Sequence, residues 1–342
     1  MGLTVAVTGP TGEIGKPFMR ALDRAREVDR IIGMARRPFD PAAHGWKKVE
    51  YRQGDVLDRA SVESLCAGAD VVVHLAFIIM AGSSESDHIN LQGSRNVFEA
   101  AVAVGARRLV YASSVAAYGF PALDRPIVED DPATGNRHMP YSRHKGEVEA
   151  LLAEALDGTG TDAYIFRPCI VAGPEAPILV NQIPYVRWGD RLPGAVRGLL
   201  DAVPVLRPVI PDPGVPFQLV HHDDVATALR AGVLGRGRPG AYNLAGDGEI
   251  TMSDLAQALG YYSVPVPEPA IDATAQIVSR LPFMPDEATW IEAVRRPTLM
   301  DTGKARRLLR WRPKYDAAET LRQTVEAARP ASAAGDGFIA RG

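Results

Sequence analysis

The first half of the chain alternates short, continuous apolar runs with segments of helical spacing, and this alternation limits the possible folds more than any other feature. The apolar runs are rich in Val, Ile and Leu, which is typical of strands that are buried on both faces. Strands that alternate with helices through short links favour a parallel, doubly wound α/β sheet. We expect strands at 3–9, 30–36, 70–77, 107–114 and 162–168, and helices at 15–26, 60–68, 90–105 and 141–157.

The second half lacks this regular alternation. Residues 171–216 carry nine prolines and indicate a loop-rich segment outside the main sheet. Residues 217–235 return to a strand and a helix, 241–246 indicate a further strand, and 252–330 hold short helices and proline-rich links. We therefore predict a sheet domain at 1–170 that is rejoined by about 216–246, a smaller region at 171–215 and 247–330, and a frayed tail at 331–342.

The composition excludes several classes of function. The hydrophobic fraction is 46% and the charged fraction is 23%, which are ordinary for a globular protein. The net charge of −3 does not indicate binding to nucleic acid or to an anionic membrane. The longest apolar stretch, 71–82, is too short to span a bilayer. Cys66 and Cys169 form neither a disulfide framework nor a metal constellation. Without a charged leader before the first strand, we predict a cytoplasmic protein with no metal site.

A glycine-rich turn, "VTGPTGEIGKP" (7–17), links the first strand to the first helix. The turn after Gly9 must be tight, Gly12 lets the backbone approach a pyrophosphate, and Gly15 lets helix and strand pack closely. The free N–H groups and partial positive charge of the helix start would then face the phosphates. A glycine-rich turn that binds nothing is the alternative, but its place in a βαβ pattern favours a Rossmann dinucleotide site that also includes Thr11, Glu13 and Ile14.

The second strand ends in "GMARR", where NAD enzymes usually carry an acid for the ribose 2′-hydroxyl. Here Ala35 is followed by Arg36 and Arg37, and two guanidinium groups suit a 2′-phosphate. The alternative is an exposed basic strand end that binds no ligand. The pattern predicts that NADP(H) is preferred, with NAD(H) possible.

Two further segments are candidates for contact with the cofactor. "GDVLD" (54–58) follows a strand-like run, and Asp55, next to Val56, can accept from the adenine amino group unless it only caps a helix or a turn. "HLA" (74–76) ends another apolar run and would place Leu75 and Ala76 against the cofactor ribose. For His74 itself, which lies between apolar neighbours, a core position is the better interpretation.

"YSRHK" (141–145) places Tyr141 and Lys145 one turn apart on one face of a helix. Random placement gives roughly 0.2 such pairs in a chain of this composition, so the spacing alone decides little. A tyrosine near an ammonium group and a positively charged nicotinamide has its phenolate favoured, so its pKa falls. Ser114, which ends the strand "YASS", can hold the oxygen that exchanges the proton, although a strand-end hydroxyl that bonds only backbone is the alternative.

Together these segments are similar to the extended short-chain dehydrogenase/reductases, the group that includes NAD-dependent sugar epimerases and dehydratases and the 3β-hydroxysteroid dehydrogenases. The resemblance covers roughly residues 3–325 and rests on these segments: "TGPTGEIG", "GDVLD", "DVVVHLA", "NLQGSRNV", "YASSVAAYG", "YSRHK", "FRPCIVAGP", "VHHDDVA", "YNLAG" and "DTGKARRLLRWRPKYDAAETL". It implies catalytic positions for Ser114, Tyr141 and Lys145, a homodimer, and a small-molecule substrate bound mostly by the C-terminal region.

The resemblance also implies further cofactor contacts. Asn90 takes a position near the cofactor, and "RPCIV" (167–171), with Pro168 and Ile170, wraps the nicotinamide end.

Several substrate contacts of the sugar-nucleotide members are missing from this chain. Those enzymes typically have Asn where Ile170 stands and Arg where Phe217 stands, while Asn181 keeps a position that resembles their diphosphate contact. Each lost charge-assisted bond costs about 1.5–3 kcal/mol. The 4,6-dehydratases need an Asp-Glu pair after the catalytic hydroxyl, where this chain has Val115 and Ala116, so that reaction is not expected.

The expected substrate pocket has an apolar character. Phe77 and Ile79 follow "HLA" beside the expected nicotinamide, and Phe217 and a Val/Leu/Pro-rich stretch at 195–216 add to it, unless these residues are simply core. We therefore expect an NADP(H)-dependent oxidoreductase that acts on a secondary alcohol or ketone of a fairly apolar small molecule. A nucleotide-sugar epimerase that works through a keto intermediate and a cofactor-binding sensor without turnover are the alternatives; the complete Ser–Tyr–Lys set argues against the sensor.

Overall fold

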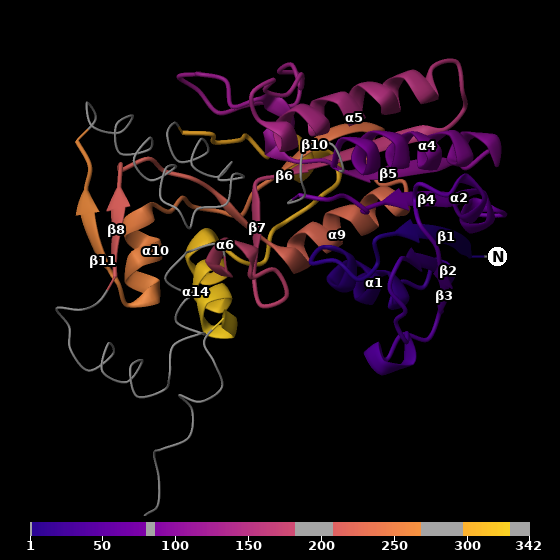
Figure 1. Cartoon of the computed structure of the whole chain (residues 1–342), viewed down its shortest axis with the longest axis horizontal. Helices are drawn as coiled ribbons and strands as arrows, with labels where there is room; N and C mark the ends of the chain where they lie inside the picture. The colour runs from indigo at the N-terminus through magenta and orange to yellow at the C-terminus, as the bar shows by residue number, and fades with distance from the viewer. Residues whose placement is uncertain (1, 80–85, 182–207, 268–296, 329–342) are drawn as a thin grey trace, which may run out of the picture.

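The computed structural model describes residues 2–79, 86–181, 208–267 and 297–328 of the chain. A seven-stranded sheet, in which every pairing is parallel, forms the centre of the larger part of the chain (Figure 1). Its order is β10-β6-β5-β4-β1-β2-β3. The strands are β1 (Leu3–Thr8), β2 (Val28–Ala35), β3 (Val49–Gln53), β4 (Val71–His74), β5 (Arg108–Ala112), β6 (Asp162–Pro168) and β10 (Gly240–Leu244).

The strand order fixes where a ligand can bind. The chain runs from β1 through β2 to the edge strand β3 and then crosses back to β4, on the other side of β1. Ligands of open parallel sheets bind at such a reversal, beyond the carboxyl ends of the two strands. Here these ends are Thr8 and His74, and His74 is paired in register with Thr8.

The sheet is buried on both faces, as the continuous apolar runs predicted. Alternate residues of a strand point to opposite faces, so Val5 and Val7 belong to one core cluster whereas Ala6, between them, belongs to the other. Helices α1 (Gly15–Asp23) and α9 (His222–Val233) pack together over the first face, and α2 (Arg59–Cys66), α4 (Gly93–Ala103) and α5 (Pro140–Leu156) cover the second (Figure 1).

A smaller region with its own core adjoins the sheet. It holds two short parallel pairs of strands, packed against α10 and α14. Its elements are β7 (Ile170–Ala172), α6 (Ile178–Asn181), β8 (Val209–Asp212), β9 (Leu219–His221), α10 (Met252–Leu259), β11 (Tyr262–Pro265) and α14 (Ala317–Ala328). The remaining short elements are η1 (Ala42–His44), η2 (His88–Gln92), η3 (Val115–Tyr118) and α13 (Gly303–Leu308).

The predicted doubly wound fold is confirmed, with local differences. The edge strand β3 was not delimited from the sequence, because "VEYRQ" alternates and is only partly buried. The strand predicted at 70–77 ends at His74, and the helix predicted at 90–105 begins as the π-turn η2. Strands β8 and β11 lie where loops and helices were expected. The expectations for 182–207, 268–296 and the tail fall outside the described residues, and the domain boundaries stay predictions.

No helix within the described ranges has the length and apolar character needed to cross a membrane.

Candidate active site

The glycine-rich turn has the geometry that a pyrophosphate site needs. Gly9 has φ 71°, and a Cβ there would lie 2.8 Å from the backbone nitrogen of Ala76, which confirms the tight turn. A Cβ at Gly15 would lie 2.2 Å from the Gly9 carbonyl oxygen, which confirms close packing of helix and strand. At Gly12, which is exposed, the nearest atom would be 3.6 Å away. Packing therefore does not require glycine at position 12, whereas a ligand that approaches the backbone does.

The start of α1 is also free to receive an anion. No side chain caps this helix at Ile14. The Lys16 N–H donates to the Gly12 carbonyl at 3.0 Å and Pro17 has no N–H, so within the described residues the Gly15 N–H is the group in the first turn of the helix that is left for a phosphate oxygen. The neighbouring Glu13 carboxyl accepts a hydrogen bond from the backbone N–H of Ile178, at the start of α6. Burial raises the pKa of Glu13, although His222 and this hydrogen bond oppose the effect. The turn thus contacts the smaller region through one side chain.

The end of β2 presents two exposed guanidinium groups. Neither Arg36 nor Arg37 is paired with a carboxylate among the described residues, and both side chains are exposed. Their backbone is held by β3: the Tyr51 hydroxyl donates to the Ala35 and Arg37 carbonyls at 3.3 and 3.2 Å, and Gln53 donates to the Arg36 carbonyl at 3.1 Å. A fixed backbone that carries two unpaired cations suits a 2′-phosphate.

Asp55 forms a turn in this structure. Its carboxylate accepts from the Leu57 N–H at 3.0 Å, while Asp58 is the residue that caps α2. Val56 is buried beside Gly93, where a Cβ would lie 2.6 Å from its methyl carbon. The turn alternative for Asp55 is therefore observed, and its contact with adenine stays a prediction.

His74 lies in the core, as the sequence suggested. Its ring bonds the hydroxyls of Thr8 at 2.8 Å and Ser94 at 3.0 Å, and burial, together with the Lys145 charge, lowers its pKa to about 3. The N–H groups of Leu75 and Ala76 both donate to the Thr8 hydroxyl at 3.3 Å. Thr8 and His74 thus fix the backbone that follows β4.

The structure separates the two serines at the end of β5. The Ser113 hydroxyl donates to the buried carboxylate of Glu149 at 2.5 Å. The Ser114 hydroxyl forms a hydrogen bond with Tyr141, and its oxygen also accepts from the Ala116 N–H at 3.1 Å. Ser114 is therefore the serine that faces the predicted acid/base, and the alternative of a purely structural hydroxyl accounts for only one of its two bonds.

Lys145 is almost fully buried, with 3% of its surface exposed. Its ammonium group donates to the Ala112 carbonyl at 2.8 Å and to the Tyr111 hydroxyl at 3.3 Å, and it lies 3.7 Å from the centre of the Phe77 ring. Its distance from the Tyr141 ring centre is 5.9 Å. The three N–H bonds of the ammonium therefore have three partners: a carbonyl, a hydroxyl and an aromatic face.

The pKa values of the pair differ from the expected direction in the free protein. Burial raises the pKa of Tyr141, although its hydrogen bond with Ser114 favours the phenolate. Burial also lowers the pKa of Lys145 to about 7, against the carboxylate of Glu149, which raises it. The positive charge of Lys145, which should stabilise the Tyr141 phenolate, is thus itself disfavoured by burial. The predicted fall in the pKa of Tyr141 is not a property of the chain alone and stays a prediction for the complex with oxidised cofactor.

A buried ion pair joins helix α5 to strand β6 of the sheet. Arg167 of β6 bonds both oxygens of Glu149, at 2.6 and 3.0 Å, and the exposed fraction of each side chain is 7%. Arg167 also donates to the Tyr118 hydroxyl at 2.8 Å. Glu149 thereby links Lys145, through its charge, to the sheet. The sequence did not single out this pair, although the spacing of 141, 145 and 149 on one helical face could have indicated Glu149.

The expected substrate residues fall into different environments. Phe77 packs edge-on against Tyr141, with ring centres 5.7 Å apart, and Ile79 is 45% exposed. Val115 is buried, and Phe217 belongs to the core of the smaller region, so the core alternative holds for Phe217. The Asn181 side chain lies outside what the structure describes.

Two further cofactor candidates lie at strand ends. Pro168 is the buried last residue of β6, and Ile170, in β7, is partly buried against the core of the smaller region.

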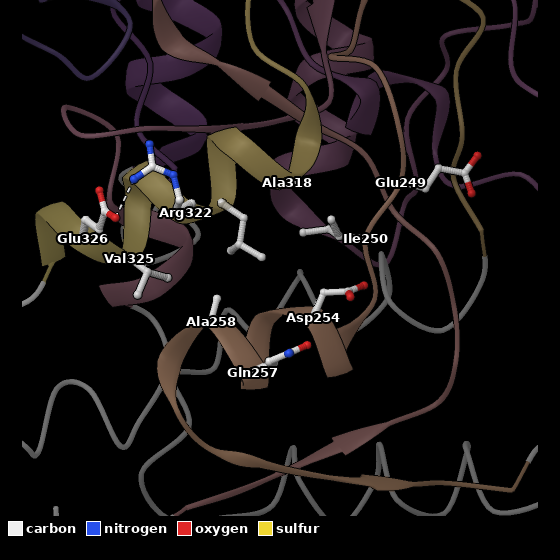
Figure 2. A pocket seen from close by; sticks show the side chains of 10 residues that line it. Glu249, Ile250, Asp254, Gln257, Ala258, Ala318, Arg322, Val325 and Glu326 are labelled. Carbon is white, nitrogen blue, oxygen red and sulfur yellow. Dashed lines mark hydrogen bonds and ion pairs between the residues drawn. The ribbon is translucent and has the colours of Figure 1, made fainter.

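A pocket of about 400 Å³ lies apart from these residues, between α10 and α14 (Figure 2). Glu249, Asp254, Arg322 and Glu326 give it a charged rim, and Arg322 is already paired with Glu326. None of the candidate site residues lines it. We therefore assign this pocket no role in the proposed reaction.

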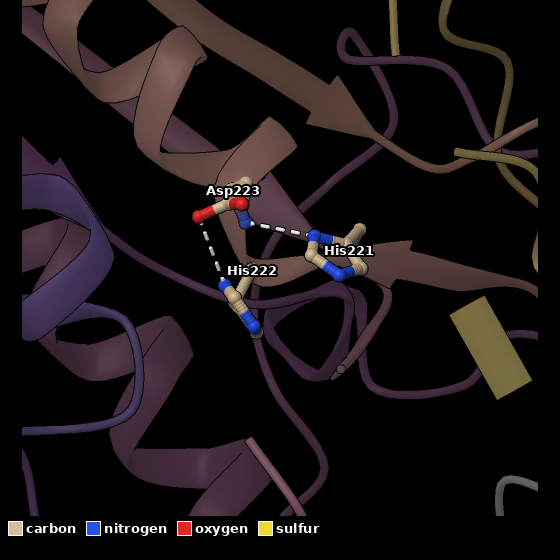
Figure 3. A group of neighbouring side chains, drawn as sticks. All are labelled: His221, His222 and Asp223. Atoms are coloured by element: carbon tan, nitrogen blue, oxygen red, sulfur yellow. Dashed lines mark hydrogen bonds and ion pairs between the residues drawn. The ribbon is translucent and has the colours of Figure 1, made fainter. Parts of the chain in front are cut away.

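Three neighbouring side chains, His221, His222 and Asp223, resemble a metal-ligand set (Figure 3). Three of the four ring nitrogens form hydrogen bonds: His221 accepts from the Asp223 N–H at 3.1 Å and bonds Gln323 at 3.2 Å, and His222 accepts from the Glu175 N–H at 3.2 Å. The fourth, Nδ1 of His222, is buried without a hydrogen bond to any described residue and lies 3.2 Å from the Asp223 carboxylate. These histidines lie at the junction between β9 and α9, and the absence of a metal site stays a prediction.

Several known proteins are similar to this chain in sequence. A human 3 beta-hydroxysteroid dehydrogenase type 7 is 33% identical over 212 residues, which is 56% of each chain. An uncharacterized protein of Sinorhizobium fredii is 27% identical over 335 residues, covering 94% of this chain and 77% of its own. An uncharacterized protein of Mycobacterium tuberculosis is 27% identical over 330 residues, but this chain spans only 30% of its length.

Solved structures share the fold. The dTDP-glucose 4,6-dehydratase of Streptomyces venezuelae, solved with NAD bound, superposes with a TM-score of 0.72 at 24% identity over 97% of this chain and 98% of its own. A sequence model of the NAD dependent epimerase/dehydratase family matches residues 5–245, which is more than half of the chain. The protein therefore belongs to this family of NAD-dependent enzymes, the extended short-chain dehydrogenase/reductases.

Proposed function

We propose that this protein transfers a hydride between NADP(H) and a secondary alcohol or ketone of a fairly apolar small molecule. The observation that carries the proposal is that Ser114 forms a hydrogen bond with Tyr141 and that the Lys145 ammonium lies 5.9 Å from the Tyr141 ring centre. In this proposal Ser114 holds the substrate oxygen, Tyr141 exchanges the proton with it, and Lys145 supplies positive charge. The nicotinamide, when bound, supplies or accepts the hydride.

The chain's own residues are suited to holding this cofactor. Gly12 leaves space for a pyrophosphate to approach the backbone, and the uncapped start of α1 can offer the Gly15 N–H to it. The unpaired guanidinium groups of Arg36 and Arg37 support the choice of NADP(H), because no carboxylate ends β2.

The substrate class is supported by apolar contacts and by relatives. Phe77 contacts both catalytic side chains, and Ile79 adds an exposed apolar surface next to it. The human relative is named for 3β-hydroxysteroids, and a sterol demethylase protein B of Methylococcus capsulatus is 29% identical over 209 residues, 59% of this chain and 62% of its own. A 3β-hydroxysteroid is therefore the first substrate class to test, as an example of an apolar secondary alcohol.

The test follows nicotinamide absorbance with the purified protein, NADP⁺ or NAD⁺, and a 3β-hydroxysteroid or UDP-glucose as substrate. We expect turnover with the steroid and NADP⁺, and turnover lower by roughly 10²–10⁴-fold in the Tyr141→Phe variant under the same conditions. In a parallel titration with the cofactor present, UDP should bind weakly, because Ile170 and Phe217 carry no charge. Micromolar binding of UDP, or conversion of UDP-glucose to its epimer, would replace this proposal by the epimerase.

A further inference from the structure

The loop that carries Phe77 is held by a clamp from the neighbouring π-turn. Asn90, fully buried in η2, accepts from the Ile78 N–H at 2.9 Å and donates to the Ile78 carbonyl at 2.9 Å. Both backbone groups of one loop residue are thus bound by one side-chain amide. Phe77 precedes Ile78 and contacts both Lys145 and Tyr141. The orientation of the Asn90 amide therefore determines the position of the Phe77 ring beside these two side chains.

The two bonds to Ile78 also determine which way the Asn90 amide points. Its oxygen must face the Ile78 N–H and its nitrogen the Ile78 carbonyl, which leaves one amide hydrogen for another acceptor. That hydrogen faces Nδ1 of His144, 3.4 Å from the amide nitrogen. Nδ1 must therefore be unprotonated, and the neutral ring carries its hydrogen on Nε2.

The other side of the His144 ring is consistent with this tautomer. Nε2 donates to the carboxylate of Asp87, which also accepts from Arg143 at 2.9 Å. Partial burial disfavours the Asp87 charge, but hydrogen bonds from His144 and Arg143 outweigh it and hold the pKa of Asp87 below its usual value. Arg143 is paired in addition with Glu147. Among the described residues, the charged groups that face His144 are thus Asp87 and Arg143, both at Nε2, with the Arg143 Nη2 3.2 Å from it, whereas Nδ1 faces Asn90.

We propose that His144 is a positioning residue, which holds the Phe77 loop against Tyr141 and Lys145 through Asn90, with its Nδ1 as the acceptor that orients the Asn90 amide. A second hydrogen at Nδ1 would face the amide hydrogens of Asn90, so Asn90 would have to turn and release Ile78. His144 is itself almost fully buried on the catalytic helix, between the two catalytic side chains in sequence. The role in catalysis rests on the proposed function, whereas the hold on the loop does not.

The hold on the loop can be measured without any substrate. Amide hydrogen exchange of Ile78 in the full chain reports its bond to Asn90 directly. In His144→Leu, which lacks an acceptor, we expect exchange at Ile78 to be roughly tenfold faster, about one lost hydrogen bond. In His144→Asn the side-chain oxygen can take the place of Nδ1, so exchange should stay close to that of the unmodified protein. His138→Leu, an exposed change in the preceding loop, is the matched control.

Activity provides a second readout. If the protein is the proposed oxidoreductase, kcat/KM of His144→Leu should fall in parallel, and His144→Asn should restore it.

Equal exchange at Ile78 in all variants, or equal loss in His144→Leu and His144→Asn, would overturn the proposal even if turnover is normal. If turnover is absent but the exchange pattern holds, only the proposed function fails. Should His144→Leu not fold, exchange at Ile78 in His144→Asn decides alone: loss of protection there would overturn the proposal.

Discussion

Replacing Lys145 by Met should stabilise the free protein while removing its activity. Burial lowers the pKa of this lysine from 10.5 to about 7. One pKa unit corresponds to about 1.4 kcal/mol, so below about pH 7 the buried ammonium costs the fold roughly 5 kcal/mol as an upper figure. Met keeps the length of the side chain without the charge and can contact the Phe77 ring with its sulfur.

The substitution also removes favourable contacts. The Ala112 carbonyl and the Tyr111 hydroxyl lose the hydrogen bonds that Lys145 donates, and a buried unpaired group costs about 1–3 kcal/mol. At the lower figure for each of the two groups, the net gain at pH 6.5 should be at most about 3 kcal/mol. In the unmodified protein the unfolded chain binds this proton between about pH 7 and about pH 10.5 while the folded chain does not, so its stability rises with pH. The advantage of the variant should accordingly shrink to about zero near pH 9.

The assay is urea unfolding of both proteins, without cofactor, at the acidic and the alkaline pH. Lys47→Met, which removes a charge from the exposed surface, is the control and should change the free energy of unfolding by no more than about 0.5 kcal/mol at either pH. A Lys145→Met variant that is no more stable than the unmodified protein at pH 6.5, or whose advantage does not depend on pH, would show that the buried ammonium carries no such cost.

Three further predictions concern the proton relay, the buried ion pair and the cofactor. Tyr141→Phe should lower turnover by roughly 10²–10⁴-fold and leave the Kd of NADPH nearly unchanged; normal turnover would remove Tyr141 from the mechanism. Glu149→Gln should lower the free energy of unfolding by about 3–5 kcal/mol, because Arg167 would remain buried without its partner; a loss below about 1 kcal/mol would mean that Arg167 finds water. Ala35→Asp with Arg36→Ser should remove most of an expected 10- to 150-fold preference for NADPH, which is the value of one charge-assisted bond; equal Kd values for NADPH and NADH in the unmodified protein would refute the assignment.

The features that could be predicted from the sequence are those that local chemistry determines. The buried strands were readable because continuous runs such as 71–73 have no polar residue to place on an exposed face. The turn at Gly9 and the close approach at Gly15 followed from spacing alone, and both are confirmed. Tyr141 and Lys145 share a helical face because they lie four residues apart.

What escaped sequence reasoning depends on contacts between distant segments. The edge strand β3 exists because β2 pairs with it, not because "VEYRQ" is apolar. The widened turn η2 lies where Asn90 must reach Ile78, a demand that no local pattern in 88–92 expresses. The sequence alone does not show whether Ser113 or Ser114 faces Tyr141. Only the pairing of β5 with its neighbours decides which hydroxyl faces Glu149 and which faces Tyr141.

Three residues on one face of helix α5 differ in how deeply they are buried. Tyr141 is partly exposed and can meet a substrate, Lys145 is buried where its charge is costly, and Glu149 is buried with Arg167 behind it. A buried ion pair contributes little net stability compared with apolar residues of the same size. Here its carboxylate raises the pKa of Lys145 against burial, so the pair keeps the lysine closer to the charged form that the proposed role of Tyr141 requires. Under that proposal the ion pair serves the charge of the site more than the stability of the fold.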